Sequence, residues 1–155
     1  MTDYSYRNDP AVPPFPDDKP VFVFDGQCGF CSAWVQFALK RDRRRRYRFL
    51  AAQSEIGAAL YRHYGLDERL HETSLFLENG RPYLRVNGII RLLAGLGFPW
   101  TACHALGLIP RLWADALYDH IARNRYRIAR TSPSCSLPNP ADADRFMSPV
   151  ARNNR

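Results

Sequence analysis

The sequence predicts an α/β fold whose strands and helices follow one another in the order β-α-β-α-β-β-α. Three observations support this order. Four apolar residues at positions 21 to 24 precede a helical pattern, a second strand and helix pattern follows at 47 to 64, and Asn79-Gly80 separates two further apolar runs. Strands that alternate with helices favour parallel pairing, whereas an Asn-Gly pair between apolar runs favours a hairpin.

The first strand comprises residues 21 to 24 and ends at an Asp25-Gly26 turn. A short run made only of valine and phenylalanine is typical of a strand that is covered on both faces. The turn leads to Cys28 and Cys31, where helical periodicity begins. Residues three apart are neighbours on a helix, so a modest adjustment could close a disulfide between these two thiols.

The next segment predicts a mostly buried helix over residues 31 to 40, with a narrow polar stripe at intervals of four. The basic run at 41 to 46 ends it, and the alternation at 47 to 50 predicts a second strand. Because a helical crossover joins the two strands, we expect them to be parallel.

Ser54 is suited to cap a helix that extends through Tyr64, and Gly65 is a suitable stop for it. Its expected apolar face consists of Ile56, Ala59, Leu60 and Tyr64.

The hairpin is predicted over residues 74 to 77 and 83 to 86, because Asn79-Gly80 suits a turn in which both central residues have positive φ. Pro82 lacks an N–H for a ladder, so its strand should start there or lie at an edge of the sheet.

A third helix over residues 89 to 96, with Asn87 as its cap, completes the order of elements. This order is the thioredoxin-like arrangement, with helices on the faces of one central sheet. Functional sites of open α/β sheets lie beyond the carboxyl ends of the strands. Cys28 and Cys31 stand at such an end.

Residues 92 to 110 contain no Asp, Glu, Lys or Arg, over a length close to that of a membrane span. Glycines and Pro99 interrupt the run, so two short packed helices are the simpler interpretation, and contact with a membrane is the alternative. The next helix, over residues 111 to 123, is expected to cover the core. Its apolar residues at helical spacing are Leu112, Trp113, Ala116, Leu117 and Ile121.

The length of 155 residues fits one domain. We expect residues 1 to 19 to be extended and poorly ordered, residues 20 to 147 to form the domain, and residues 148 to 155 to be a loose tail. The chain has four cysteines, and its first twenty residues hold charges and prolines without an apolar core. These features favour the cytoplasm, where thiols stay reduced.

The net charge of +7 is concentrated at residues 41 to 46 and 123 to 130. Such charge could attract nucleic acid, an anionic membrane or acidic proteins, but solvated helix ends are the simpler interpretation. No nucleic-acid-binding module accompanies the charge, so no nucleic-acid partner is expected. The sequence leaves the oligomeric state open.

The Cys28-x-x-Cys31 pair points to thiol-disulfide exchange. A thiolate is the attacking species in this reaction, and a helix N-terminus favours it at Cys28. We expect Cys28 to be the more exposed thiol and the nucleophile, while Cys31 lies deeper and resolves the mixed disulfide. Asp25 is either only the turn residue before Gly26 or also a group that exchanges protons with a cysteine.

A second interpretation is a binding module, either basic on its surface or stabilised by zinc, in which the cysteines are structural. Cys135 with Cys103 or His104 could complete four ligands, although no second closely spaced pair exists. The leading interpretation requires no cofactor. Its partners would be a protein or small-molecule disulfide and a thiol electron donor, because the chain has no glycine-rich dinucleotide motif.

The motif Asp25-Gly26-x-Cys28-x-x-Cys31 after an apolar strand resembles the DCC family of thiol-disulfide oxidoreductases, whose name records Asp, Cys and Cys. The resemblance covers about residues 20 to 147. Further landmarks are Gln53-Ser54, Ile109-Pro110, Tyr118-Asp119 and Cys135-x-Leu137-Pro138.

This resemblance implies a thioredoxin-like fold with a C-terminal helical extension, and redox chemistry at Asp25, Cys28 and Cys31. The chain departs from ordinary thioredoxins at one place. Their cis-proline beside the site corresponds to a position near Glu72 or Thr73, where this sequence has no proline. Peptide binding is therefore expected to be different or weaker.

Overall fold

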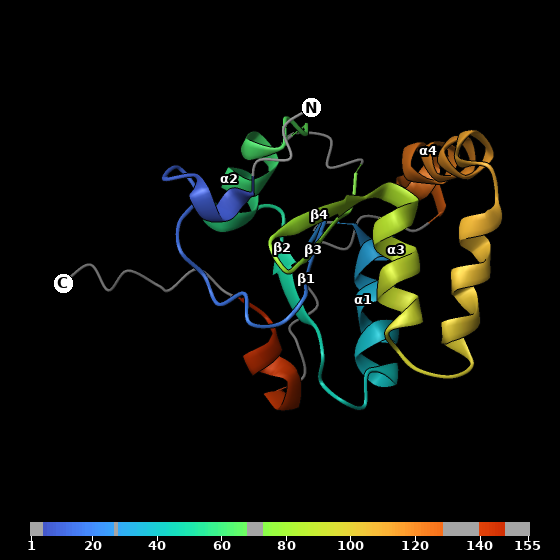
Figure 1. Cartoon of the computed structure of the whole chain (residues 1–155), viewed down its shortest axis with the longest axis horizontal. Helices are drawn as coiled ribbons and strands as arrows, with labels where there is room; N and C mark the ends of the chain where they lie inside the picture. The colour runs from blue at the N-terminus through green and yellow to red at the C-terminus, as the bar shows by residue number, and fades with distance from the viewer. Residues whose placement is uncertain (1–4, 27, 68–72, 129–139, 148–155) are drawn as a thin grey trace.

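A four-stranded mixed sheet with the order β2-β1-β3-β4 lies at the centre of the structure, a computed structural model (Figure 1). The structure describes residues 5–26, 28–67, 73–128 and 140–147. Strand β1 is parallel to β2 and antiparallel to β3, which is antiparallel to β4. The thioredoxin-like arrangement is confirmed. The strands are β1 (Val21–Phe24), β2 (Arg48–Ala51), β3 (Leu75–Glu78) and β4 (Arg81–Leu84).

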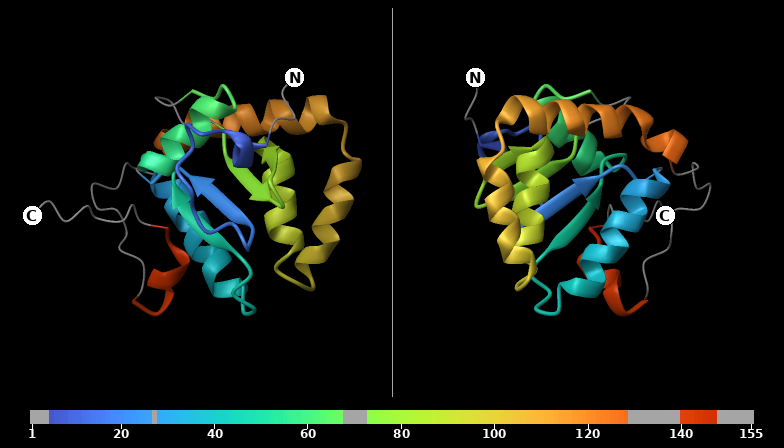
Figure 2. Two further views of the ribbon diagram at one scale, coloured as in Figure 1. Left: turned by 60° about the vertical axis from the view of Figure 1, so that its left-hand side comes forward. Right: turned by 90° about the vertical axis from the view of Figure 1, so that its right-hand side faces the viewer.

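Helices cover both faces of this sheet (Figure 2). Side chains alternate along β1, so that Val21 and Val23 pack in one cluster with α2, while Phe22 and Phe24 pack in another with α1 and α3. The α-helices are α1 (Gly29–Arg41), α2 (Glu55–His63), α3 (Arg85–Ala94) and α4 (Arg111–Ile128). The 3₁₀ helices are η1 (Tyr6–Asn8), η2 (Trp100–Leu108) and η3 (Pro140–Arg145).

The local capping and turn signals are confirmed. The Ser54 hydroxyl accepts a hydrogen bond from the Gly57 N–H at 3.0 Å, and α2 stops before Gly65, whose φ is +64°. Asn79 and Gly80 have φ of 52° and 77°, as a type I′ turn requires. Each of these features depends only on residues close in sequence.

The predicted start of the third helix is wrong. Helix α3 begins at Arg85, and its N-cap is Leu84, which makes no side-chain capping bond. Strand β4 ends at Leu84, so the chain passes directly into the helix through Arg85, with φ of 55°. Asn87 therefore lies inside the helix. Strand β4 lies at the edge of the sheet, as Pro82 indicated.

The expectation that the apolar residues of α4 cover the core is also wrong. Leu112, Trp113 and Leu117 are 85, 76 and 62% exposed. Two contacts fix the rotation of the helix: the Tyr118 hydroxyl bonds to Ser74, and Asp119 pairs with Arg85 at 3.6 Å. The opposite face of α4 therefore points inward.

The run from 92 to 110 is divided between α3 and η2, which lie side by side (Figure 1). Among the described residues, no helix combines the length and the apolar character needed to cross a bilayer.

The N-terminal segment from residue 5 to 19 lies against the core. Tyr6 and Val12 are buried in the cluster beside α2, and the Ser5 hydroxyl donates to the Gly80 carbonyl at 2.9 Å. The prediction for residues 148 to 155 falls outside the described residues.

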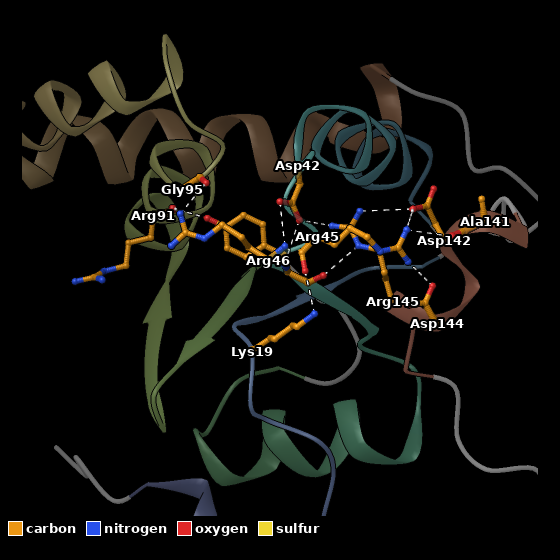
Figure 3. A network of polar contacts seen from close by, with 11 residues as sticks. Lys19, Asp42, Arg45, Arg46, Arg91, Gly95, Ala141, Asp142, Asp144 and Arg145 are labelled. Carbon is orange, nitrogen blue, oxygen red and sulfur yellow. Dashed lines mark hydrogen bonds and ion pairs between the residues drawn. The ribbon is translucent and has the colours of Figure 1, made fainter.

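One residue of the basic run at 41 to 46 takes part in a buried ion pair (Figure 3). Asp42 and Arg145 of η3 are both buried and pair with each other. The Asp42 carboxylate also accepts the N–H groups of Arg46 and Tyr47, each at 3.1 Å. Arg45, by contrast, is exposed and pairs with Asp144 at 2.5 Å. The interpretation of this run as a solvated helix end therefore fails for Asp42.

Stability should fall as pH rises above about 10, in part through Tyr47. Burial raises the pKa of Tyr47 to about 12. Between pH 10 and pH 12 the folded protein thus keeps the Tyr47 proton that the unfolded chain loses. The contribution of this proton to the free energy of unfolding is therefore complete below pH 10 and is lost towards pH 12. Urea titrations of the wild type and Tyr47→Phe should show a smaller alkaline loss in the variant. Equal losses would contradict this assignment.

Residues after η3 continue along the free edge of β2. The Met147 N–H donates to the Phe49 carbonyl at 2.9 Å, and Phe146 forms a parallel bridge with Phe49. The other edge of the sheet is β4, with Pro82 as its second residue.

Candidate active site

The carboxyl end of β1 positions Cys28 at the start of a helix. The Asp25 carbonyl accepts the Cys28 N–H at 3.3 Å, which closes the turn between strand and helix. Cys28 is the N-cap of α1, and its Sγ accepts the Cys31 N–H at 3.4 Å. The Cys28 sulfur thus has an N–H donor beside it and lies at the positive end of the helix dipole.

The exposure of the two cysteines is the reverse of the prediction. Cys28 is 0% exposed, whereas Cys31 is partly exposed and borders a cavity. The helix cap explains the difference, because it turns the Cys28 sulfur back onto the first turn of α1. The thiol at the N-terminus of the helix is therefore not the thiol with the better access to solvent.

Asp25 is buried, with 2% of its surface exposed, at the same strand end. The Gln53 side chain donates to Asp25 Oδ1 at 2.5 Å and accepts the Gly26 N–H at 3.0 Å. Gln53 thereby fixes both the carboxylate and the turn. Our sequence interpretation gave Gln53 no role, although it stands two residues after β2, and parallel strands end at the same edge of a sheet.

A cavity of about 220 Å³ opens beside Cys31 and Asp25. Its lining is otherwise mostly apolar and comes from β1, α1 and α4 together with residues of α2, α3 and the chain before β3. The other lining residues are Phe22, Phe24, Trp34, Tyr61, Ser74, Ile89, Tyr118, Ile121 and Ala122. Among the described residues of this lining, Asp25 is the one with an acidic or basic side chain. The site thus combines a thiol and a carboxylate with a space suited to an apolar group.

Two tyrosines fix the chain segment before β3. The Tyr61 hydroxyl donates to the Thr73 carbonyl at 2.5 Å, and the Ser74 N–H donates to the Tyr118 hydroxyl at 2.9 Å. The segment includes Thr73, one of the two residues near which the thioredoxin cis-proline would fall, and the other, Glu72, lies outside the described residues. Sequence periodicity did not identify Tyr118, because its contact with Ser74 spans 44 positions.

The zinc interpretation finds no support in the part of the chain that is described. No group of three or more His, Cys, Asp and Glu side chains lies close enough there to hold a metal ion. Cys103 is a free cysteine in η2, and Cys135 lies outside the described residues.

Comparison with known proteins gives matches over most of the chain. A model of the family described as DCC1-like thiol-disulfide oxidoreductase matches residues 22–131. The uncharacterized protein YuxK of Bacillus subtilis is 33% identical over 127 residues, which cover 82% of this chain and 93% of that protein. A chloroplastic DCC family protein of Arabidopsis thaliana is 32% identical over 122 residues, which cover 78% and 71%. No solved structure matches the chain.

Proposed function

The chain belongs to the family of DCC1-like thiol-disulfide oxidoreductases, and we propose on this basis that it exchanges disulfides through Cys28 and Cys31. The observation that carries the proposal is the Cys31 N–H directed at Cys28 Sγ at the N-terminus of α1. The attacking species in this reaction is a thiolate, and reactive cysteines are found at helix N-termini.

In the first step, the Cys28 thiolate attacks one sulfur of a substrate disulfide. A mixed disulfide forms, and the departing substrate thiolate takes a proton from solvent. Because Cys28 is buried, its sulfur must move to the cavity wall beside Cys31 before this attack.

In the second step, Cys31 attacks Cys28 Sγ in the mixed disulfide. The Cys31 thiol transfers its proton to Asp25, which borders the same cavity, and the second substrate sulfur leaves as a thiolate that takes this proton from Asp25. The substrate has then gained two electrons and two protons, and the enzyme holds a Cys28–Cys31 disulfide. A dithiol electron donor reduces this disulfide, and the cycle uses no metal or nucleotide.

The cavity suggests which disulfides are accepted. Its lining is mostly apolar, so a disulfide that carries an apolar group should enter it more readily than a charged one. The carbonyl of Thr73 and the N–H of Ser74 already bind Tyr61 and Tyr118, so they are less free to bind the main chain of a peptide. A peptide substrate would need contacts other than those of thioredoxin.

The test is a comparison of Cys31→Ser and Cys28→Ser, with Cys103→Ser as a matched control of another free cysteine. We expect Cys31→Ser to accumulate a mixed disulfide at Cys28, both active-site variants to lose turnover, and the control to keep it. Mass spectrometry identifies the linked cysteine. Accumulation at Cys31 in Cys28→Ser would reverse the two roles. If neither variant forms a mixed disulfide and the wild type reduces no test disulfide, the proposed function is wrong.

A further inference from the structure

One side of α4 carries an exposed apolar surface that the reaction does not use. Leu108 and Ile109 directly precede the helix and are 86 and 45% exposed, and Leu112, Trp113 and Leu117 follow. We call these five residues the apolar face. Figure 2 shows α4 crossing one end of the molecule beside η2. Single exposed apolar residues are common, but several that are close together along the chain are typical of an interaction site.

The charges of α4 are distributed unevenly around the helix. On a helix with 3.6 residues per turn, Arg123 and Arg127 share a side with Leu112, Trp113 and Leu117, and both arginines are exposed. Asp115 lies towards the other side, with Tyr118 and Ala122 of the cavity, whereas Asp119 lies at the boundary next to Leu112 and pairs with Arg85. The outward side is therefore apolar in its first half and basic in its second.

The chain that precedes the apolar face adds no acidic group to it. Residues 79 to 114, which include η2 and the first turn of α4, contain no Asp or Glu. Arg111 stands beside Leu112 and is exposed. Apolar side chains with neighbouring arginines and one tryptophan are typical of helices that lie in the interface of an anionic membrane.

From the apolar face and the arginines that follow it on the same side, we propose that the outward side of α4 docks on an anionic lipid surface. The apolar side chains protrude, since three of them are at least 76% exposed. A bilayer interface accepts protruding side chains without a matching pocket, and Trp113 suits that depth. A second copy of this chain fits the face less well, because each copy has a net charge of +7 and would bring the same arginines to the contact.

Docking would place the candidate active site close to the membrane. Tyr118, Ile121 and Ala122 line the cavity from α4, so one helix, about 10 Å across, separates the cavity from the bound lipid. A substrate disulfide that is held at the membrane surface would then be within reach of the active site. The docking proposal itself does not depend on the redox chemistry.

The test is sedimentation of the full chain with vesicles at physiological ionic strength, where the Debye length is about 8 Å. Vesicles of phosphatidylcholine alone are compared with equimolar phosphatidylcholine and phosphatidylglycerol. We expect binding to the anionic vesicles only, and its loss at about 1 M salt. Trp113→Ser with Leu117→Ser should weaken binding at least about tenfold, and Arg123→Gln with Arg127→Gln about tenfold.

The matched control is Arg43→Gln with Arg44→Gln, which removes the same amount of charge. These two arginines follow the C-terminal end of α1, whereas the cavity is lined by residues of its N-terminal half. It should change binding by less than about twofold. All variants should keep wild-type thermal midpoints, because the substituted side chains are exposed. The proposal falls if the wild type does not bind the anionic vesicles or if the control loses as much binding as the α4 variants. A lipid-free dimer that the Trp113 and Leu117 substitutions dissociate would assign the face to a second copy instead.

Discussion

The rate of resolution of the mixed disulfide at Cys28 should fall by about 10²-fold or more when Asp25 is replaced by asparagine. Asparagine keeps an oxygen for the hydrogen bond from Gln53 but cannot take the proton of Cys31. The change therefore removes the proton acceptor and leaves the turn intact. The mixed disulfide is preformed with a fluorescent thiol, and the release of this thiol is followed by stopped flow. This measures the resolution step separately from the initial attack.

Two further measurements separate proton transfer from a structural effect. The rate of the first attack, measured in a Cys31→Ser background, should change much less in Asp25→Asn than the resolution step does. The pH dependence of resolution should also change, because the missing carboxylate no longer titrates. An unchanged resolution rate in Asp25→Asn would remove Asp25 from the reaction and leave it as a turn residue only.

Replacing Arg145 with alanine should lower the free energy of unfolding by about 3 to 5 kcal/mol. The loss is large because Asp42 would remain as a buried carboxylate without its cation. Arg45→Ala is the matched control, since Arg45 belongs to the same network but pairs with Asp144 at the surface, where such pairs contribute at most about 1 kcal/mol (Figure 3). Urea denaturation measures both. Similar losses in the two variants would show that burial of the Asp42–Arg145 pair does not increase its effect on the free energy of unfolding.

The parts of the fold that could be predicted from the sequence are those set by neighbouring residues. The buried strand β1, the cap at Ser54 and the turn at Asn79-Gly80 each depend on backbone preferences within a few positions. The candidate site was predicted for the same reason, because the end of β1 and the start of α1 bring Asp25, Cys28 and Cys31 to one edge of the sheet.

The parts that could not be predicted depend on contacts between distant residues. Helical periodicity identified an apolar side of α4, but its direction is set by Tyr118 and Ser74, which are 44 positions apart. The partner of Asp42 lies 103 positions away. The burial of Cys28 depends on how its side chain turns at the helix cap, which the spacing of cysteines does not specify.

The two edges of the sheet limit how another chain can pair with it. Backbone addition requires a row of free N–H and C=O groups, and at the β2 edge Phe146 and Met147 already use the groups around Phe49. At the β4 edge, Pro82 has no N–H to donate within a strand of four residues. A partner or an unfolded copy is thus discouraged from extending this sheet as a further strand, which protects the molecule against edge-to-edge aggregation. Recognition is left to side chains on its helices and in its cavity.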